Sequence, residues 1–275
     1  MEQNSRSQII SIPGAIIIGC TILAIGYFVT QRQSAPADTA VAQVPAINVA
    51  PVTSADHILG NPNAPIKVVE YSDPSCPFCK MFSPTMNDII KTYGNTGKVA
   101  WVYRNFPLDE PNTDGSVLHP NASTQSQAFE CAASLGGNDK FWAFEKEWYS
   151  VFPLQGATNR SVTEDNAQLV NVAKTIGLDA VSFNDCLSSG QFKSKIDDQR
   201  LSGMNAGVSG TPTSFFLLSK AAGPRTVNLM SELLISYKLS PSFLYLSNDR
   251  KIIMMSGAMP KELITKILDT VLSEI

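Results

Sequence analysis

Hydrophobic positions recur with three different patterns along this chain. Residues 9–29 are almost continuously apolar, a length that matches the hydrocarbon thickness of a bilayer. From residue 66 onward, short β-branched runs bounded by turn residues indicate strands. Longer stretches in which apolar residues return every three or four positions indicate helices. The pattern predicts one membrane-spanning helix followed by a domain of mixed strands and helices.

The first predicted elements of that domain surround residue 76. Residues 66–71 form an apolar run typical of a buried strand, and residues 99–106 form a second one. Between them we expect a helix from residue 76 to about residue 93, with Ser75 as its N-cap and a kink at Pro84.

Helical patterning then continues to residue 205. The expected helices are residues 121–135, 141–152, 163–176, 182–189 and 192–205. After them we expect a strand (214–218), a short helix (227–237), a hairpin (243–246 with 252–255) and a closing helix (261–275).

The amino-terminal segment admits three interpretations. An uncleaved anchor over residues 1–30 agrees with the length of the apolar run. A cleaved signal peptide has a shorter apolar region, and a lipoprotein signal is suggested by the residues before Cys20, although residues 21–29 stay apolar. Residues 31–56 are rich in Ala, Pro, Val, Gln and Thr without periodicity, so we interpret them as a linker to a domain over residues 57–275.

Composition narrows the possible functions. The net charge of −3 comes without a basic block, which argues against nucleic acid as a partner. Only two histidines are present, which leaves little material for a His-based metal site, and we expect no metal. Five cysteines suffice for two pairs and one leftover.

Cys76 and Cys79 form a Cys-x-x-Cys pair between the first predicted strand and the following helix. Unpaired N–H groups and the helix dipole at a helix start favour a thiolate on Cys76. Such a thiolate attacks disulfides and also leaves readily from a mixed disulfide. We therefore expect Cys76 to be the nucleophile and Cys79 the resolving thiol, with no cofactor beyond their redox-active disulfide. Half of a zinc site is the alternative, but no second ligand pair of this kind occurs.

Two separate stretches resemble the DsbA-like disulfide oxidoreductases. The first covers residues 60–65 and 68–73 and ends in Cys76-Pro77-Phe78-Cys79; the second covers residues 207–213, before the strand at 214–218. The resemblance implies an α/β thioredoxin-like fold with an inserted helical domain at about residues 120–206. Residues 219–240 would be a further insertion.

The same resemblance assigns expected roles to further residues. Thr211 and Pro212 match the family's substrate-binding cis-proline loop, and Glu70 matches its buried acid, which helps to move the proton of Cys79. Pro77 keeps the family's dipeptide character. Phe78 departs from it, because the type member has histidine there to stabilise the nucleophilic thiolate.

Cys131 and Cys186 lie in two predicted helices, at positions where many DsbA-like relatives also have cysteines. The resemblance implies a structural disulfide between them, and two free buried thiols are the alternative. A structural disulfide requires an oxidising compartment, which agrees with an anchored domain on the periplasmic or extracellular side of a membrane.

Taken together, these features predict an enzyme that forms disulfides in secreted or membrane proteins. Its partners would be substrate proteins with free thiols or disulfides and, by resemblance alone, a DsbB-like or VKOR-like membrane protein that reoxidises it. A reductase, an isomerase or a maturation factor kept reduced by a membrane partner is the nearest alternative. A chaperone-like or metal-binding module without catalysis is more distant.

Overall fold

The computed structural model describes residues 47–153 and 161–275. The predicted anchor over residues 1–30 and most of the predicted linker lie outside the described residues. Within the described ranges, no helix is both long and apolar enough to cross a membrane.

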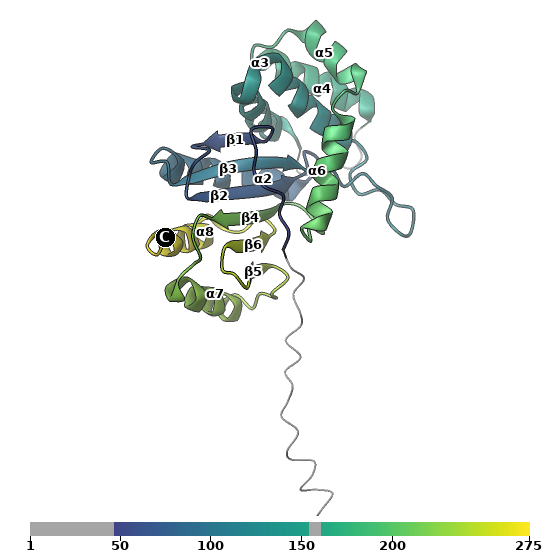
Figure 1. Ribbon diagram of the computed structural model, residues 1–275. Coiled ribbons are helices and arrows are strands. Elements are labelled where there is room, and N and C mark those ends of the chain that lie inside the picture. Colours follow the sequence, from purple (N-terminus) through teal and green to yellow (C-terminus); the bar gives the residue numbers. More distant parts are fainter. Residues whose placement is uncertain (1–46, 154–160) are drawn as a thin grey trace, which may run out of the picture. The chain divides into compact units, whose positions relative to one another are not determined.

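A mixed sheet forms the centre of the domain (Figure 1). Its six strands in the described part of the chain run in the spatial order β1-β3-β2-β4-β6-β5. Their bounds are β1 (His57–Gly60), β2 (Ile66–Ser72), β3 (Val99–Asn105), β4 (Thr213–Leu218), β5 (Leu244–Leu246) and β6 (Ile252–Ser256). β2 is central: it pairs in parallel with β3 and antiparallel with β4. The element that the sequence analysis did not predict is β1, which pairs antiparallel with β3.

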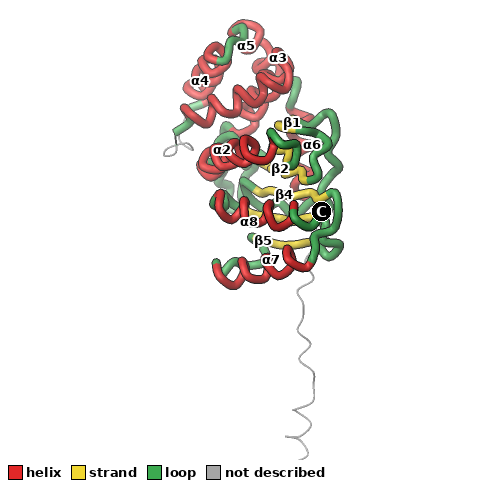
Figure 2. Tube along the Cα trace, turned by 90° about the vertical axis from the view of Figure 1, so that its left-hand side faces the viewer, coloured by secondary structure: helices red, strands yellow, loops and turns green. Residues whose placement is uncertain are grey.

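Both faces of the sheet are covered, and this explains the continuous apolar runs of β2 and β3. Side chains alternate between the faces: Val68 belongs to one core cluster and Val69 to the other. The first face packs against α2 (Pro77–Ile89), α7 (Pro224–Ser236) and α8 (Lys261–Leu272), which lie along one side in Figure 2.

The helical insertion consists of α3 (Ala122–Val151), α4 (Val162–Thr175), α5 (Ala180–Ser189) and α6 (Lys193–Asn205). Three helices of the insertion, α3 to α5, gather beyond the β1 edge of the sheet, and the fourth, α6, runs back alongside the sheet (Figure 1). The two helices expected at 121–135 and 141–152 run together as α3, which is interrupted at Gly137, where φ is 77°. A disulfide between Cys131 and Cys186 joins α3 to α5.

Two further local expectations differ from the structure. Cys76, rather than Ser75, is the N-cap of α2, because the Ser75 hydroxyl donates instead to Gln125 Oε1 at 2.8 Å. The helical segment ends close to the expected residue 93, but its last turn, η1 (Ile90–Gly94), is the wider π-helix and not α-helix.

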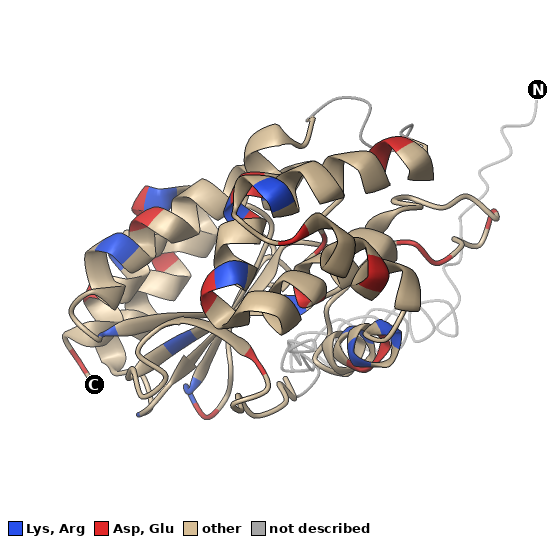
Figure 3. Ribbon diagram, turned by 90° about the horizontal axis from the view of Figure 1, so that it is seen from above, with Lys and Arg blue, Asp and Glu red and all other residues tan. Residues whose placement is uncertain are grey.

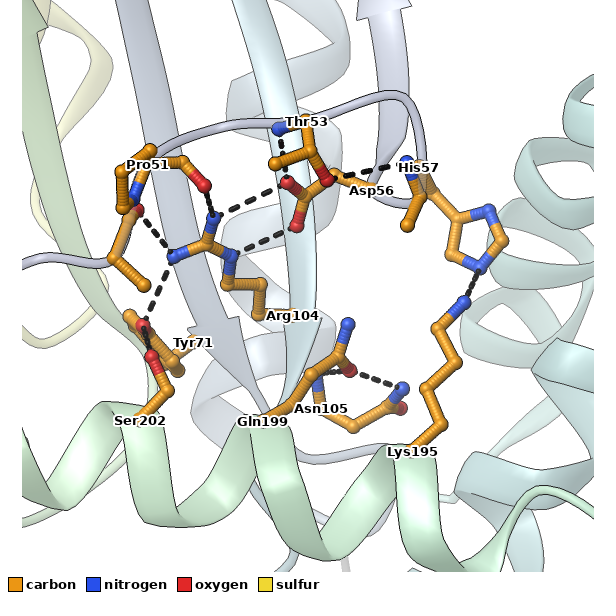
Figure 4. Close-up of polar contacts among 12 residues, drawn as sticks. Pro51, Thr53, Asp56, His57, Tyr71, Arg104, Asn105, Lys195, Gln199 and Ser202 are labelled. Atoms are coloured by element: carbon orange, nitrogen blue, oxygen red, sulfur yellow. Dashed lines mark hydrogen bonds and ion pairs between the residues drawn. The ribbon is translucent and has the colours of Figure 1, made fainter.

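Residues 47–56, which the sequence placed in the linker, form an arm that lies against the second face of the sheet. Ile47, Val49 and Val52 pack against the core cluster on that face. The guanidinium of Arg104, on β3, donates to the carbonyl oxygens of Ala50 and Pro51, both at 3.0 Å (Figure 4). Residues 47–56 therefore pack as part of the domain.

Charged residues of both signs are interspersed over the helices and loops (Figure 3).

Candidate active site

Cys76 lies where the chain leaves β2 and enters α2. Its backbone is extended (φ −78°, ψ 122°), its N–H donates to the carbonyl of Asp73 at 3.0 Å, and Pro77 occupies the first helical turn. Proline fits there because the N–H that it lacks has no partner within the helix. Cys79 follows one turn later on the buried side of α2, and both cysteines are free thiols in this structure.

The loop before β4 brings a second segment to Cys76. Because β4 pairs with β2, the loop that precedes it lies at the edge of the sheet where β2 ends. The Thr211–Pro212 peptide in this loop is cis. The Cys76 thiol donates to the carbonyl oxygen of Thr211 at 3.4 Å, and the Pro212 carbonyl accepts from the N–H of Gly257 at 2.7 Å.

The two thiols have opposite acidities. A hydrogen bond from the Cys79 thiol is the main influence that lowers the pKa of Cys76 to about 6, against the opposing effect of burial. Burial is the main influence that raises the pKa of Cys79 well above its ordinary value, and the charges of Cys76 and Glu70 add to it. At neutral pH the pair therefore holds a thiolate on Cys76 and a proton on Cys79.

Glu70 lies on β2 and is 2% exposed. Its Oε2 accepts a hydrogen bond from the indole N–H of Trp101 at 2.9 Å. Burial raises the pKa of this carboxyl to about 7, even though hydrogen bonds from Ser72 and Trp101 oppose the shift. A carboxyl with this pKa both holds and releases a proton near neutrality.

Comparison with known proteins decides the family. A model of the family described as thioredoxin matches residues 52–234, more than half of the chain. The chain belongs to this family. Within it, the chain has the fold of the DsbA-like proteins described next.

The DsbA-like chain has curated relatives of two kinds. It is 27% identical over 163 residues to the probable disulfide bond formation protein D of Bacillus cereus, a match that covers 59% of this chain and 70% of that protein. It is 29% identical over 185 residues to a Na(+)/H(+) antiporter NhaA 3 of Salinispora tropica, over 66% of this chain. The second match covers only 24% of the antiporter.

Solved structures share the fold of the DsbA-like chain. Oxidised BdbD from Bacillus subtilis superposes with a TM-score of 0.59 at 18% identity, and the match covers 83% of this chain and 98% of BdbD. The alpha-DsbA1 protein of Wolbachia pipientis gives a TM-score of 0.57 at 19% identity, covering 81% and 93% of the two chains.

The DsbA-like site also contains two buried groups to which the sequence analysis gave no role. His119, in the loop before α3, pairs through Nδ1 with Asp73 Oδ2 at 2.7 Å. Glu145, on α3, is 1% exposed, and neither of its carboxyl oxygens has a hydrogen-bond partner among the described residues. Burial raises the pKa of Glu145 to about 8, and the charge of Glu70 adds to the shift. No sequence motif marks either residue, because each reaches the site through tertiary packing.

An open cavity of about 720 Å³ adjoins Cys76 in the DsbA-like domain. Most of its lining is apolar and comes from the start of α2, the loop after β3, the end of α6 and the loop before β4. The lining includes Pro77, Phe78, Phe106, Leu118, Met204 and Thr211. Among the described residues, no three His, Cys, Asp or Glu side chains gather in a way that would hold a metal ion.

Proposed function

We propose that Cys76 and Cys79 oxidise pairs of thiols in substrate proteins, with Cys76 as the nucleophile and Cys79 as the resolving thiol. The opposite shifts of the two thiol pKa values are the single observation that carries this proposal. A stabilised thiolate lowers the free energy of the reduced pair and makes its disulfide a stronger oxidant. The same thiolate is a good leaving group when a mixed disulfide breaks down.

The reaction proceeds in two exchanges. A substrate thiolate attacks Cys76 Sγ of the Cys76–Cys79 disulfide, the bond between the two cysteines breaks, and its electron pair goes to Cys79, which takes up a proton. A second substrate thiol loses its proton and attacks the substrate sulfur of the mixed disulfide, and Cys76 leaves as a thiolate. The substrate is oxidised by two electrons, and the enzyme pair is reduced by two.

Glu70 serves the first exchange in this scheme. Its charge affects the pKa of Cys79, and its own pKa of about 7 lets it give up a proton at the pH at which Cys79 needs one. The Glu70 carboxylate that remains then regains a proton from solvent after the exchange.

The cavity beside Cys76 would hold the substrate chain. Phe78 is 56% exposed at its rim, and Leu118 and Met204 are about as exposed. The carbonyl of Thr211 lies within reach of Cys76 and offers a backbone acceptor to an extended segment. An apolar surface with backbone contacts suits unfolded clients of varied sequence, because neither feature reads particular side chains.

We further propose that the domain works outside the cytoplasm, tethered through the apolar segment at residues 9–29. The Cys131–Cys186 disulfide supports an oxidising compartment. A quinone-linked membrane protein of the DsbB or VKOR type would then reoxidise the reduced pair.

The equilibrium constant of the purified full chain with a glutathione redox buffer tests the direction of electron flow. We expect a reduction potential well above the value of about −270 mV typical of a reducing thioredoxin. A potential near that value would overturn the oxidase role and favour a reductase or maturation factor, for which Phe78 in place of a polar residue is the supporting feature. The Cys79→Ser variant, which cannot form the pair, serves as the blank.

A further inference from the structure

The dipeptide between the two cysteines gives the Cys76 thiolate no positive charge. Pro77 and Phe78 have no polar side-chain atom, and the Phe78 ring is 56% exposed at the rim of the cavity. Any charge that favours the thiolate must therefore come from outside the motif.

Asp73 would by itself oppose a thiolate on Cys76. It is fully buried, and its negative charge raises the pKa of Cys76. Its carboxylate is held in place by the backbone N–H groups of Ser75 at 2.7 Å and Leu108 at 2.8 Å. Asp73 also touches the thiol pair directly, because its own N–H donates to Cys79 Sγ at 3.5 Å.

His119 is placed to reverse the effect of Asp73. Its ring is 4% exposed, it lines the same cavity as Cys76, and its Nδ1 lies 2.7 Å from Asp73 Oδ2. Burial lowers the pKa of His119, but the hydrogen bond to Asp73 and the charges of Asp73 and Cys76 outweigh it, so the pKa is raised. Because an interaction between two charges is mutual, the imidazolium favours the thiolate as much as the thiolate favours the imidazolium.

Other charged groups near His119 do not substitute for it. Arg200, on α6, and Glu110 line the cavity, but they form an ion pair at 3.0 Å and largely compensate each other. Asp165, on α4, accepts hydrogen bonds from the amides of Asn121 and Gln125. Among these described groups, His119 is the cation whose partner carboxylate, Asp73, itself contacts the thiol pair, so it offsets the charge that opposes the Cys76 thiolate.

We propose that the His119 imidazolium, held by Asp73, supplies the positive charge that stabilises the Cys76 thiolate and that the Pro77-Phe78 dipeptide does not provide. His119 thus makes the Cys76–Cys79 disulfide more oxidising, although it lies about 40 residues along the chain from the motif. This inference rests on the proposed role of Cys76 as the nucleophile.

The thiolate of the reduced full chain can be titrated by its absorbance near 240 nm in the wild type and in His119→Gln, which keeps a hydrogen-bond donor for Asp73 but carries no charge. We expect the variant to have roughly tenfold less thiolate relative to thiol near pH 6, since one pKa unit is a factor of ten. Its equilibrium constant with glutathione should shift about tenfold toward a less oxidising pair, for the same reason.

His57→Gln is the matched control. The chain has only these two histidines, and His57 is also buried and paired with a carboxylate, Glu130, at 2.8 Å. It stacks on Phe141 and is not among the residues that line the cavity. Figure 4 shows its contact with Lys195. This variant should titrate like the wild type; an equal change in both variants would overturn the inference.

A second measurement does not depend on a variant that folds. In proton NMR of the wild type, the pKa of His119 should fall when the Cys76–Cys79 disulfide forms, because the thiolate charge disappears. A His119 pKa that is equal in both redox states would overturn the inference alone. If titration of the wild type shows that the pKa of Cys76 is not lowered, both the proposed function and this inference are overturned.

Discussion

The two cysteine pairs of this protein share burial and helical location but differ in their surroundings. Cys76 and Cys79 lie within one helical turn at the start of α2, next to the Asp73 N–H, the Thr211 carbonyl and the Glu70 carboxyl. Cys131 and Cys186 are 55 residues apart and link α3 to α5.

The second pair has few polar neighbours. Cys131 is fully buried in the main apolar cluster, and the polar contact of Cys186 is the side-chain amide of Gln191 at 3.1 Å. Burial alone therefore does not decide the reactivity of a cysteine pair. What separates the two pairs is whether nearby dipoles and charges favour a thiolate on one sulfur and a proton on the other.

Removing each cysteine pair in turn tests whether only the first pair is reactive. Cys76→Ser should abolish thiol–disulfide exchange, because no other described free thiol adjoins the cavity, and should leave the stability of the fold nearly unchanged. The double variant Cys131→Ala, Cys186→Ala should keep the exchange rate per folded molecule but lose up to about 4 kcal/mol of unfolding free energy, as a closed loop of this length implies. Exchange with a model peptide and urea unfolding measure the two effects. Residual exchange in Cys76→Ser would remove the basis for assigning the chemistry to the first pair.

A smaller effect concerns the buried carboxyls beneath the reactive pair. The unfolded chain releases the Glu145 proton near pH 4.5, whereas the folded protein holds it up to about pH 8. The unfolding free energy should therefore fall as the pH rises through this window and level off above it. Glu145→Gln, which stays neutral, should remove a part of this loss on the order of 4 kcal/mol by pH 8.

Urea unfolding between pH 4 and pH 9 checks this expectation. In the variant, the unfolding free energy should still fall with pH, but less steeply and only up to about pH 7, because Glu70 still holds its own proton up to about that pH. Parallel curves for the variant and the wild type would show that Glu145 ionises like an exposed carboxyl.

The smallest expected effect comes from the motif itself. Phe78→His would add a second imidazole beside Cys76 and should increase the thiolate-to-thiol ratio near pH 6 by roughly threefold, about half a pKa unit. If His119 already supplies charge, the gain should be larger in the His119→Gln background than in the wild type. Equal gains in both backgrounds would mean that the two imidazoles act on Cys76 independently.

Local patterns predicted much of the fold. The β-branched run of β2 and the helical spacing of α4 to α8 lie within a few residues of their observed positions, because burial of a face imposes its period on the sequence. β1 was missed because it has only four residues, among them His57 and Gly60, and little hydrophobic character. The arm over residues 47–56 was assigned to a linker because its order comes from Arg104, a partner about 50 residues away.

The sequence predicted only those residues of the candidate site that belong to a recognisable motif. Cys76 and Cys79 stand out by spacing alone, and Glu70 and Pro212 stand out by resemblance. No local sequence pattern marks His119 or Glu145. The pKa of each side chain depends on which charges the fold brings within a few ångströms. Ser75 shows the opposite failure: its position suits a cap, but a tertiary partner, Gln125, takes its hydroxyl.

The contacts that Arg104 makes with the arm (residues 47–56) would decide where a pulling force applied ahead of the arm reaches the sheet. The Arg104 guanidinium also binds both carboxylate oxygens of Asp56, at 2.8 and 3.1 Å, so the arm is gripped at each end of a short span. A pull along the chain from ahead of Ile47 would reach the sheet at β3 and β1, not at α2. The thiol pair and the loop that faces it would then keep their spacing under such a load.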